Sequence, residues 1–224
     1  MSTVMNVVGD VVLAGQCGAS WLRLREQGAG ARAWSSFFGS MTWGFAAGGL
    51  RHAIPYDGPA GLGVLVCVNL AVGAGVIAAQ SATLAWLPRQ IRRRLRDAFL
   101  IQLGAFGALS LWRHDFMPAF VNLVIGFGWV LVTAIAAGQR GREGAASITR
   151  GLGLGVVSGV VYLVGRGPAE WFDHVDVAHI LIAGALLLLY RGARREAAPV
   201  DPAPQPGRAP RIWARGGFLS GEIE

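Results

Sequence analysis

The sequence predicts an all-α, polytopic membrane protein with seven transmembrane helices, its N-terminus outside and its C-terminus cytoplasmic. Hydrophobic residues make up 53% of the 224 residues and charged residues 15%, and the mean hydropathy is +0.46. That composition lies outside the range of soluble globular domains. A membrane-crossing helix needs about 20 mostly apolar residues. The charge-poor stretches of that kind run roughly over residues 4–22, 33–54, 60–87, 97–113, 117–138, 147–165 and 175–191.

Turn residues separate these stretches and support a count of seven rather than six or eight. They lie at Pro55 to Pro59, at Leu87-Pro88 and at Gly165 to Pro168, where proline and glycine interrupt helices. The fourth and seventh stretches are the shortest and have charged or polar N-terminal flanks, so their boundaries are the least defined.

The arginines predict the orientation. The chain has no lysine, and 17 of its 20 basic residues fall in the connections after the first, third and fifth helices or in the C-terminal segment. The other side holds only Arg51, Arg113 and Arg166. Because basic residues concentrate on the cytoplasmic side, this asymmetry places the C-terminus inside. The net charge of +7 then belongs to the cytoplasmic rim, and nucleic acid is not an expected partner.

All four histidines fall at helix ends that open on the outer side: His52, His114, His174 and His179. The acidic residues of this side outnumber its arginines; they are Asp10, Asp57, Asp115, Glu170, Asp173 and Asp176. Imidazoles and carboxylates together suit a divalent cation such as zinc. The sequence therefore predicts a candidate metal layer at the outer membrane boundary.

Two domains are expected: a transmembrane domain over residues 1–195 and a cytoplasmic tail over 196–224. The tail is rich in proline, glycine, alanine and arginine, a composition that builds no core and predicts disorder. Asp10 interrupts the first apolar run and no basic segment precedes it, so we expect the first helix to be retained. Cys17 and Cys67 lie inside predicted spans, where they are expected to pack as small apolar side chains.

The second helix combines a glycine stripe with a histidine. Gly44, Gly48 and His52 recur at four-residue steps, which places them on one face and lets a neighbouring helix approach closely. His52 is either a ligand at the end of this seam or an interfacial residue exposed to water.

The seventh helix begins with a second cluster. Asp173, Asp176 and His179 recur at three-residue steps and share a face, whereas His174 shares it only from a non-helical lead-in. Asp173 or Asp176 is either a helix N-cap or a ligand. His179 lies within the apolar run, where an ionisable side chain is a functional candidate.

Two further polar positions belong to the same side. Ser110 lies four residues before His114, so its hydroxyl would hold that imidazole or a metal-bound water unless Arg113, His114 and Asp115 form an interfacial anchor. Asp10, two turns into the first helix, has to be neutral or paired.

These features resemble the CREST superfamily, which includes alkaline ceramidases, adiponectin-receptor-like proteins and the Per1 group. A closer resemblance is to a bacterial branch whose last helix reads approximately Asn-His-Asn-Asp-x-x-His. Asp173, His174, Asp176 and His179 match that motif, and Gly9-Asp10 fits the first helix of the branch.

The resemblance implies a zinc ion that activates water for amide hydrolysis of a lipid. Its ligands would be His52, His174 and His179. The chain departs from the superfamily in three respects. Gly48 replaces a serine, the two histidines of the last helix are five residues apart instead of four, and the aspartate expected early in helix three is represented only by Asp57. Ser110 would have to replace the serine from another helix.

Three functions follow as hypotheses. The first is a zinc-dependent hydrolase of a lipid or amphiphilic amide in the bacterial cytoplasmic (inner) membrane, with Asp57 or Asp176 as base and Ser110 as a positioning group. The second is a non-catalytic membrane subunit whose tail and glycine seams bind partner proteins. The third is binding of haem or a pigment through axial histidines. A retinal protein is excluded, because a Schiff base needs a lysine.

Overall fold

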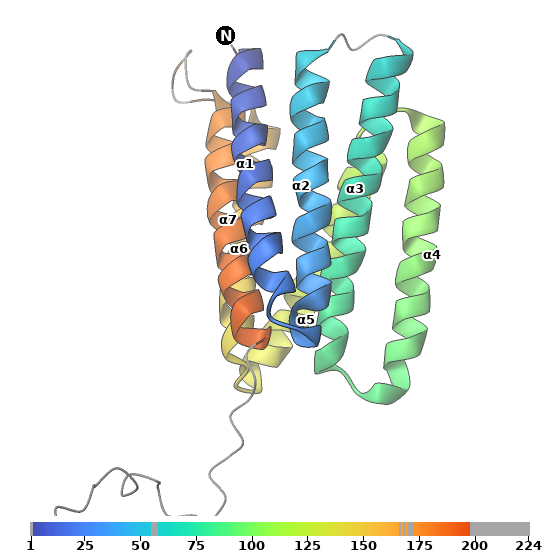
Figure 1. The fold of residues 1–224 in the computed structure, drawn as a ribbon, viewed down its shortest axis with the longest axis vertical. Helices are drawn as coiled ribbons and strands as arrows, with labels where there is room; N and C mark the ends of the chain where they lie inside the picture. Colours follow the sequence, from blue (N-terminus) through green and yellow to red (C-terminus); the bar gives the residue numbers. More distant parts are fainter. Residues whose placement is uncertain (1, 55–57, 166, 168, 170–172, 198–224) are drawn as a thin grey trace, which may run out of the picture.

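The computed structural model describes residues 2–54, 58–165, 167, 169 and 173–197. In this part of the chain, seven α-helices run alternately up and down (Figure 1). They are α1 (Ser2–Arg25), α2 (Arg32–Ala53), α3 (Pro59–Thr83), α4 (Arg89–Arg113), α5 (Met117–Gln139), α6 (Glu143–Val164) and α7 (His174–Ala197). Short 3₁₀ turns precede α2 (Ala29–Ala31) and follow α3 (Leu84–Trp86). The tail beyond Ala197 lies outside the described residues.

Four of these helices are long and apolar enough to cross a membrane: Pro59–Trp86, which includes the turn after α3, and α5, α6 and α7. The chain is therefore an integral membrane protein. The other three helices carry charged residues within or beside their apolar stretches, such as Asp10 in α1 and the arginines that open α4.

Two helices are longer than their apolar stretches. α4 begins at Arg89, directly after Pro88, and so includes a basic segment expected outside the span. α7 continues to Ala197, and its Glu196 accepts a hydrogen bond from Trp86 Nε1 at 3.0 Å and contacts Arg142 at 3.4 Å. Arginine favours helix, and its long side chain reaches the headgroup region. The α-helical backbone hydrogen bonds therefore continue beyond the hydrophobic segment.

Six helices form a closed ring with one helix outside it. Along the ring α1 packs on α2, α2 on α3, α3 on α5, α5 on α6, α6 on α7, and α7 on α1. α4 packs against α3 and α5 at the edge of the bundle (Figure 1). The largest cluster of buried apolar residues lies within the ring and includes Leu13, Cys17, Phe37, Phe38 and Ile148. Cys17 packs there as expected, whereas Cys67 is exposed.

Glycines allow α6 and α7 to pack closely. A Cβ atom on Gly151 of α6 would lie 2.9 Å from the carbonyl oxygen of Ala185 in α7. A Cβ atom on Gly192 of α7 would lie 2.7 Å from the carbonyl oxygen of Gly144. The two backbones are thus in contact, as small residues allow in membrane bundles.

Amide side chains hold α4 against the ring. Gln102 of α4 donates to Asn122 Oδ1 of α5 at 2.6 Å, and Gln80 of α3 donates to Gln102 Oε1 at 3.3 Å. Asn122 and Gln80 are buried. Interhelical hydrogen bonds of this kind join membrane helices without an apolar interface.

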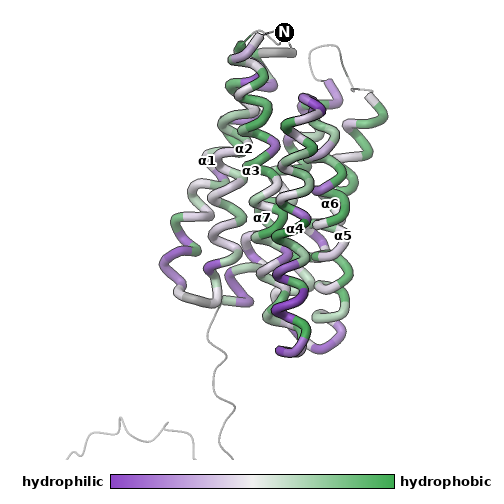
Figure 2. The backbone as a smooth tube through the Cα atoms, turned by 90° about the vertical axis from the view of Figure 1, so that its right-hand side faces the viewer, coloured by the Kyte–Doolittle hydropathy of each residue, from purple (hydrophilic) through white to green (hydrophobic). Residues whose placement is uncertain are grey.

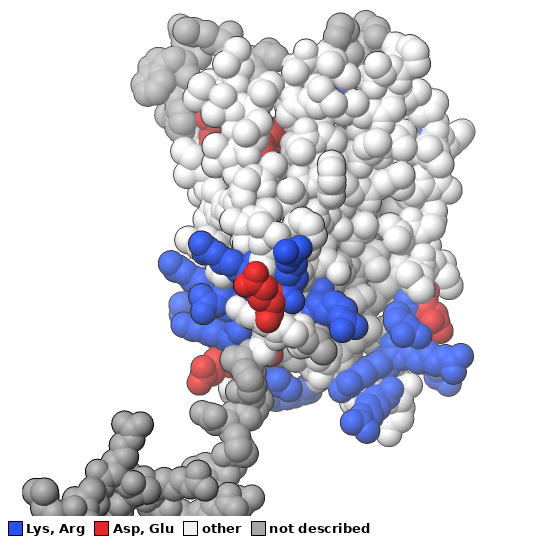
Figure 3. All heavy atoms as spheres, in the orientation of Figure 1, with Lys and Arg blue, Asp and Glu red and all other residues white. Residues whose placement is uncertain are grey.

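The two ends of the bundle differ in charge. The middle of the helices is apolar, and hydrophilic residues gather at the lower ends in Figure 2. Arginines cluster at that end on the face shown in Figure 3, opposite the N-terminus. The ends of α2 and α4 and the start of α7, which carry the histidines, lie at the other end (Figure 1).

Candidate functional site

A buried carboxylate lies between two imidazoles where α1 packs against α2 and α7. Asp10 of α1 is 7% exposed. Its Oδ1 atom lies 3.3 Å from Nε2 of His179 in α7, and its Oδ2 atom lies 3.8 Å from Nε2 of His52 in α2. The first, second and seventh helices thus each contribute one ionisable side chain. We call these three residues the Asp10 cluster.

Glycines make room for the cluster. A Cβ atom on Gly9 would lie 2.9 Å from Cγ of His179, so the imidazole rests on the bare backbone of α1. A Cβ atom on Gly48 would lie 3.0 Å from Oδ2 of Asp10, and one on Gly49 would lie 3.4 Å from Cβ of Asp10. The glycine stripe expected on α2 is therefore divided: Gly44 faces α3 at Val72, and Gly48 faces the carboxylate.

The hydrogen bonds of His179 fix its tautomer. Nδ1 lies 2.8 Å from the carbonyl oxygen of Val175. Because a carbonyl oxygen only accepts, Nδ1 carries a proton and donates it. In the neutral ring Nε2 then carries a lone pair and no proton, and this nitrogen faces a carboxylate oxygen of Asp10. Two acceptors at 3.3 Å require a cation between them, either a proton or a metal ion.

The two aspartates at the start of α7 form a capping box. Asp173 Oδ1 accepts hydrogen bonds from the backbone N–H groups of Val175 at 2.7 Å and Asp176 at 3.1 Å. Asp176 Oδ2 accepts one from the backbone N–H of Asp173 at 3.0 Å. This reciprocal arrangement satisfies the free N–H groups of a helix start. Asp173 is therefore the N-cap, Asp176 is its partner in the first turn of α7, and one oxygen of Asp176, an expected base, is engaged by the backbone.

The remaining expected site residues lie elsewhere or outside the described residues. His174, the first residue of α7, has its ring against Tyr162 of α6, with 6.0 Å between ring centroids. Ser110 donates to the carbonyl oxygen of Phe106 at 2.8 Å, and its helix, α4, lies at the opposite edge of the bundle from α7 (Figure 1). Asp57 lies outside the described residues. The structure thus brings His52 and His179 together, and it separates them from Ser110.

His114 ends α4 rather than joining the cluster. Its φ of 56° is left-handed, and its backbone N–H bonds the carbonyl oxygen of Ser110 at 3.3 Å. The neighbouring Asp115 receives two hydrogen bonds from the Arg113 guanidinium, at 2.8 and 3.0 Å. These bonds hold the pKa of Asp115 below its ordinary value. The run of Arg113, His114 and Asp115 is therefore a helix end with an ion pair.

The residue types of the cluster fit zinc, although a complete site is not assembled. Among the described residues, no three His, Cys, Asp or Glu side chains are arranged around one point as a metal requires. Two ligands of a tetrahedral zinc ion, each about 2.0 Å from the metal, lie about 3.3 Å apart. The separation of 3.3 Å between His179 Nε2 and Asp10 Oδ1 matches that spacing, whereas His52 Nε2 lies 3.8 Å from the other carboxylate oxygen.

Asp10 was expected at the same end of the bundle as the histidines, which the structure confirms, but not as a member of the site. The sequence did indicate a role for Asp10, because a carboxylate within an apolar helix needs a hydrogen-bonding or charged partner. The partner was not identifiable from the sequence, since it lies 169 residues away in the last helix.

The fold and the site define a polytopic helical membrane protein with a histidine–carboxylate cluster between its first, second and last helices. The chain belongs to the family described as "Family of unknown function (DUF6962)", whose model matches residues 5–198. The match includes all three residues of the Asp10 cluster. No curated protein and no solved structure matches the chain.

Proposed function

We propose that the protein is a zinc-dependent membrane hydrolase of a lipid or amphiphilic amide, centred on the Asp10 cluster. The observation that supports this most directly is the orientation of His179. Its Nδ1 atom donates to a backbone carbonyl, and its Nε2 lone pair is aimed at a carboxylate. Histidines that bind metal use this arrangement, in which the bond at one nitrogen orients the other.

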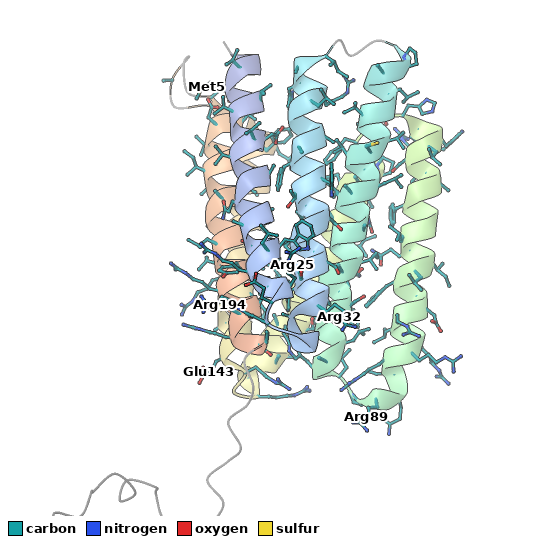
Figure 4. All side chains as sticks on the ribbon, viewed as in Figure 1. Met5, Arg25, Arg32, Arg89, Glu143 and Arg194 are labelled. Atoms are coloured by element: carbon teal, nitrogen blue, oxygen red, sulfur yellow. The ribbon has the colours of Figure 1, made fainter. Side chains whose placement is uncertain are left out.

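The proposed topology is seven spans with the cluster at the outer boundary of the bacterial cytoplasmic membrane. The arginine-rich end supports a cytoplasmic C-terminus, because basic residues favour the inner side. Met5 lies toward the opposite end from Arg25, Arg32, Arg89 and Arg194 in Figure 4.

His52, His179 and the Asp10 carboxylate would hold the zinc ion, a donor set of the His₂-carboxylate kind found in catalytic zinc sites. When bound, zinc activates water and polarises a carbonyl group. His174 joins as a ligand in this proposal if its ring leaves Tyr162. Asp57 and Asp176 are the proposed bases, and Ser110 acts only if α4 moves toward the ring.

Elemental analysis of the purified, tag-free protein tests the proposal. We expect about one zinc ion per chain, and its loss in the His52→Ala/His179→Ala double variant. The His114→Ala variant is the matched control, because this histidine is exposed at the end of α4. A zinc-free protein with intact helical circular dichroism would overturn the proposal, as would equal zinc loss in the control.

A further inference from the structure

A surface cavity of about 370 Å³, wide open to solvent, lies at the arginine-rich end of the bundle, between the end of α1 and the end of α7. It is lined by Arg23, Glu26, Gln27, Tyr190 and Arg194. Arg25 and Arg194, both labelled in Figure 4, lie toward the lower ends of these two helices. The cavity is at the opposite end from the Asp10 cluster and is independent of the proposed hydrolase.

The lining has a net positive charge that the described residues leave uncompensated. Two guanidinium groups and one carboxylate give a net charge of +1. Within the described ranges, neither Arg23, Arg194 nor Glu26 forms an ion pair within 4 Å. A ligand with a single negative charge would neutralise the cavity.

The aromatic floor of the cavity is packed against the core of the bundle. Tyr190 is 8% exposed and packs edge-on against Phe38, with 6.2 Å between ring centroids. The guanidinium carbon of Arg194 lies 5.9 Å from the centroid of the Tyr190 ring. An aromatic face attracts a cation, so this contact favours a guanidinium position beside the Tyr190 ring.

In the proposed topology the cavity lies at headgroup depth. Arg194 follows His174 by 20 residues, a rise of about 30 Å along a helix, which equals the thickness of the hydrocarbon core. Trp21, beneath the guanidinium of Arg25 at 5.7 Å, adds an aromatic side chain of the kind that borders membranes.

We propose that this cavity binds the phosphodiester headgroup of an anionic glycerophospholipid. Arg23 and Arg194 would bind the phosphate oxygens from two helices, since guanidinium groups match phosphate geometry. The Gln27 amide and the Tyr190 hydroxyl would hydrogen-bond polar groups of the headgroup. Basic cavities between membrane helices recognise anionic lipids in this way. Glu26 opposes the phosphate and weakens the binding.

Native mass spectrometry of the full-length protein, released from nanodiscs that contain equal amounts of phosphatidylglycerol, phosphatidylethanolamine and phosphatidylcholine, tests this site. We expect phosphatidylglycerol to be retained about tenfold over phosphatidylcholine. The Arg23→Gln/Arg194→Gln variant should abolish that preference. The Arg93→Gln/Arg94→Gln variant is the matched control, because it removes the same charge from the exposed start of α4.

The Glu26→Gln variant should increase the retention of phosphatidylglycerol, a gain that misfolding does not produce. Equal loss of the phosphatidylglycerol preference in both arginine variants would mean that the preference depends on the total charge of the arginine-rich end. That result would overturn the proposal. Preferential retention of phosphatidylethanolamine would also overturn it. Displacement of the lipid by an equal concentration of glycerol 3-phosphate would show a site for free phosphate rather than lipid.

Discussion

The Nε2 atom of His179 lies 3.3 Å from Oδ1 of Asp10, and this contact joins the last helix of the bundle to the first. A second imidazole, that of His52, lies 3.8 Å from the other carboxylate oxygen. Because Nδ1 of His179 donates to Val175, one cation is needed between the ring and the carboxylate. The properties of the cluster therefore depend on what supplies that positive charge.

If the proposed zinc site exists, the Asp10→Asn variant should keep the fold and lose the zinc ion. The amide N–H donates to the His179 lone pair, so thermal unfolding in detergent should change little, whereas zinc content should fall. Asp10→Ala leaves Nε2 of the half-buried His179 without its carboxylate partner and should cost about 1 kcal/mol. Asp97→Asn, an exposed position on α4, is the control. Full zinc occupancy in Asp10→Asn would count against a ligand role for the carboxylate.

The Gly9→Ala variant should destabilise the contact between α1 and α7. Its methyl group would lie 2.9 Å from Cγ of His179 and 3.0 Å from Cδ2, so the ring has to shift. Overpacking of this kind costs about 1 to 3 kcal/mol. Gly15→Ala on the same helix is the matched control, because nothing lies within 4 Å of its methyl group. Similar melting temperatures for the two variants would show that the ring adapts freely.

At position 48 serine should be tolerated better than alanine. Either Cβ atom lies 3.0 Å from Oδ2 of Asp10, and the carboxylate has to yield by a few tenths of an ångström. Only the serine hydroxyl offsets this, because it donates to the same oxygen. We expect a higher melting temperature and higher zinc content for Gly48→Ser than for Gly48→Ala. The reverse order would mean that the hydroxyl does not reach Asp10.

The Asp173→Ala variant should lower the free energy of unfolding by about 1 kcal/mol, because it removes a helix N-cap. Asp173→Asn keeps an acceptor oxygen and should remain close to the unchanged protein. Unfolding in detergent, followed by circular dichroism, measures both. If the two substitutions are equally harmful, the charge of Asp173 matters beyond its cap.

The Arg113–Asp115 ion pair should respond to acid. Arg113 lowers the pKa of Asp115 below 3.8, so the pair stabilises the folded protein above pH 3.8 and this contribution disappears as pH falls through the lowered value. In the Arg113→Gln variant the pKa of Asp115 should rise toward 3.8. Carboxyl-carbon NMR titration of Asp115 reports it directly. An unchanged titration would show that the Met117 backbone bond, at 3.1 Å, dominates.

Most of the helical segments follow from the sequence because each is a local pattern. Apolar runs of sufficient length, ended by Pro88 or by Gly165 with its φ of 66°, place helices within a few residues of their positions. The exceptions are the basic start of α4 and the end of α7, where helical backbone continues past the apolar run. At these helix ends the long arginine side chains can extend toward water while the backbone stays helical. A hydropathy pattern alone does not predict this.

By itself the sequence determined that the histidines gather at one end of the bundle and the arginines at the other, since alternating helices and residue order are sufficient for that. Only the tertiary structure decided which of them meet. α4 lies outside the helix ring, so His114 and Ser110 end up away from His179. Asp10 meets His52 and His179 because α1 lies between α2 and α7 and bare glycine backbone lets them approach. Helix neighbours and helix rotation are set by packing over the whole bundle, and no local pattern encodes them.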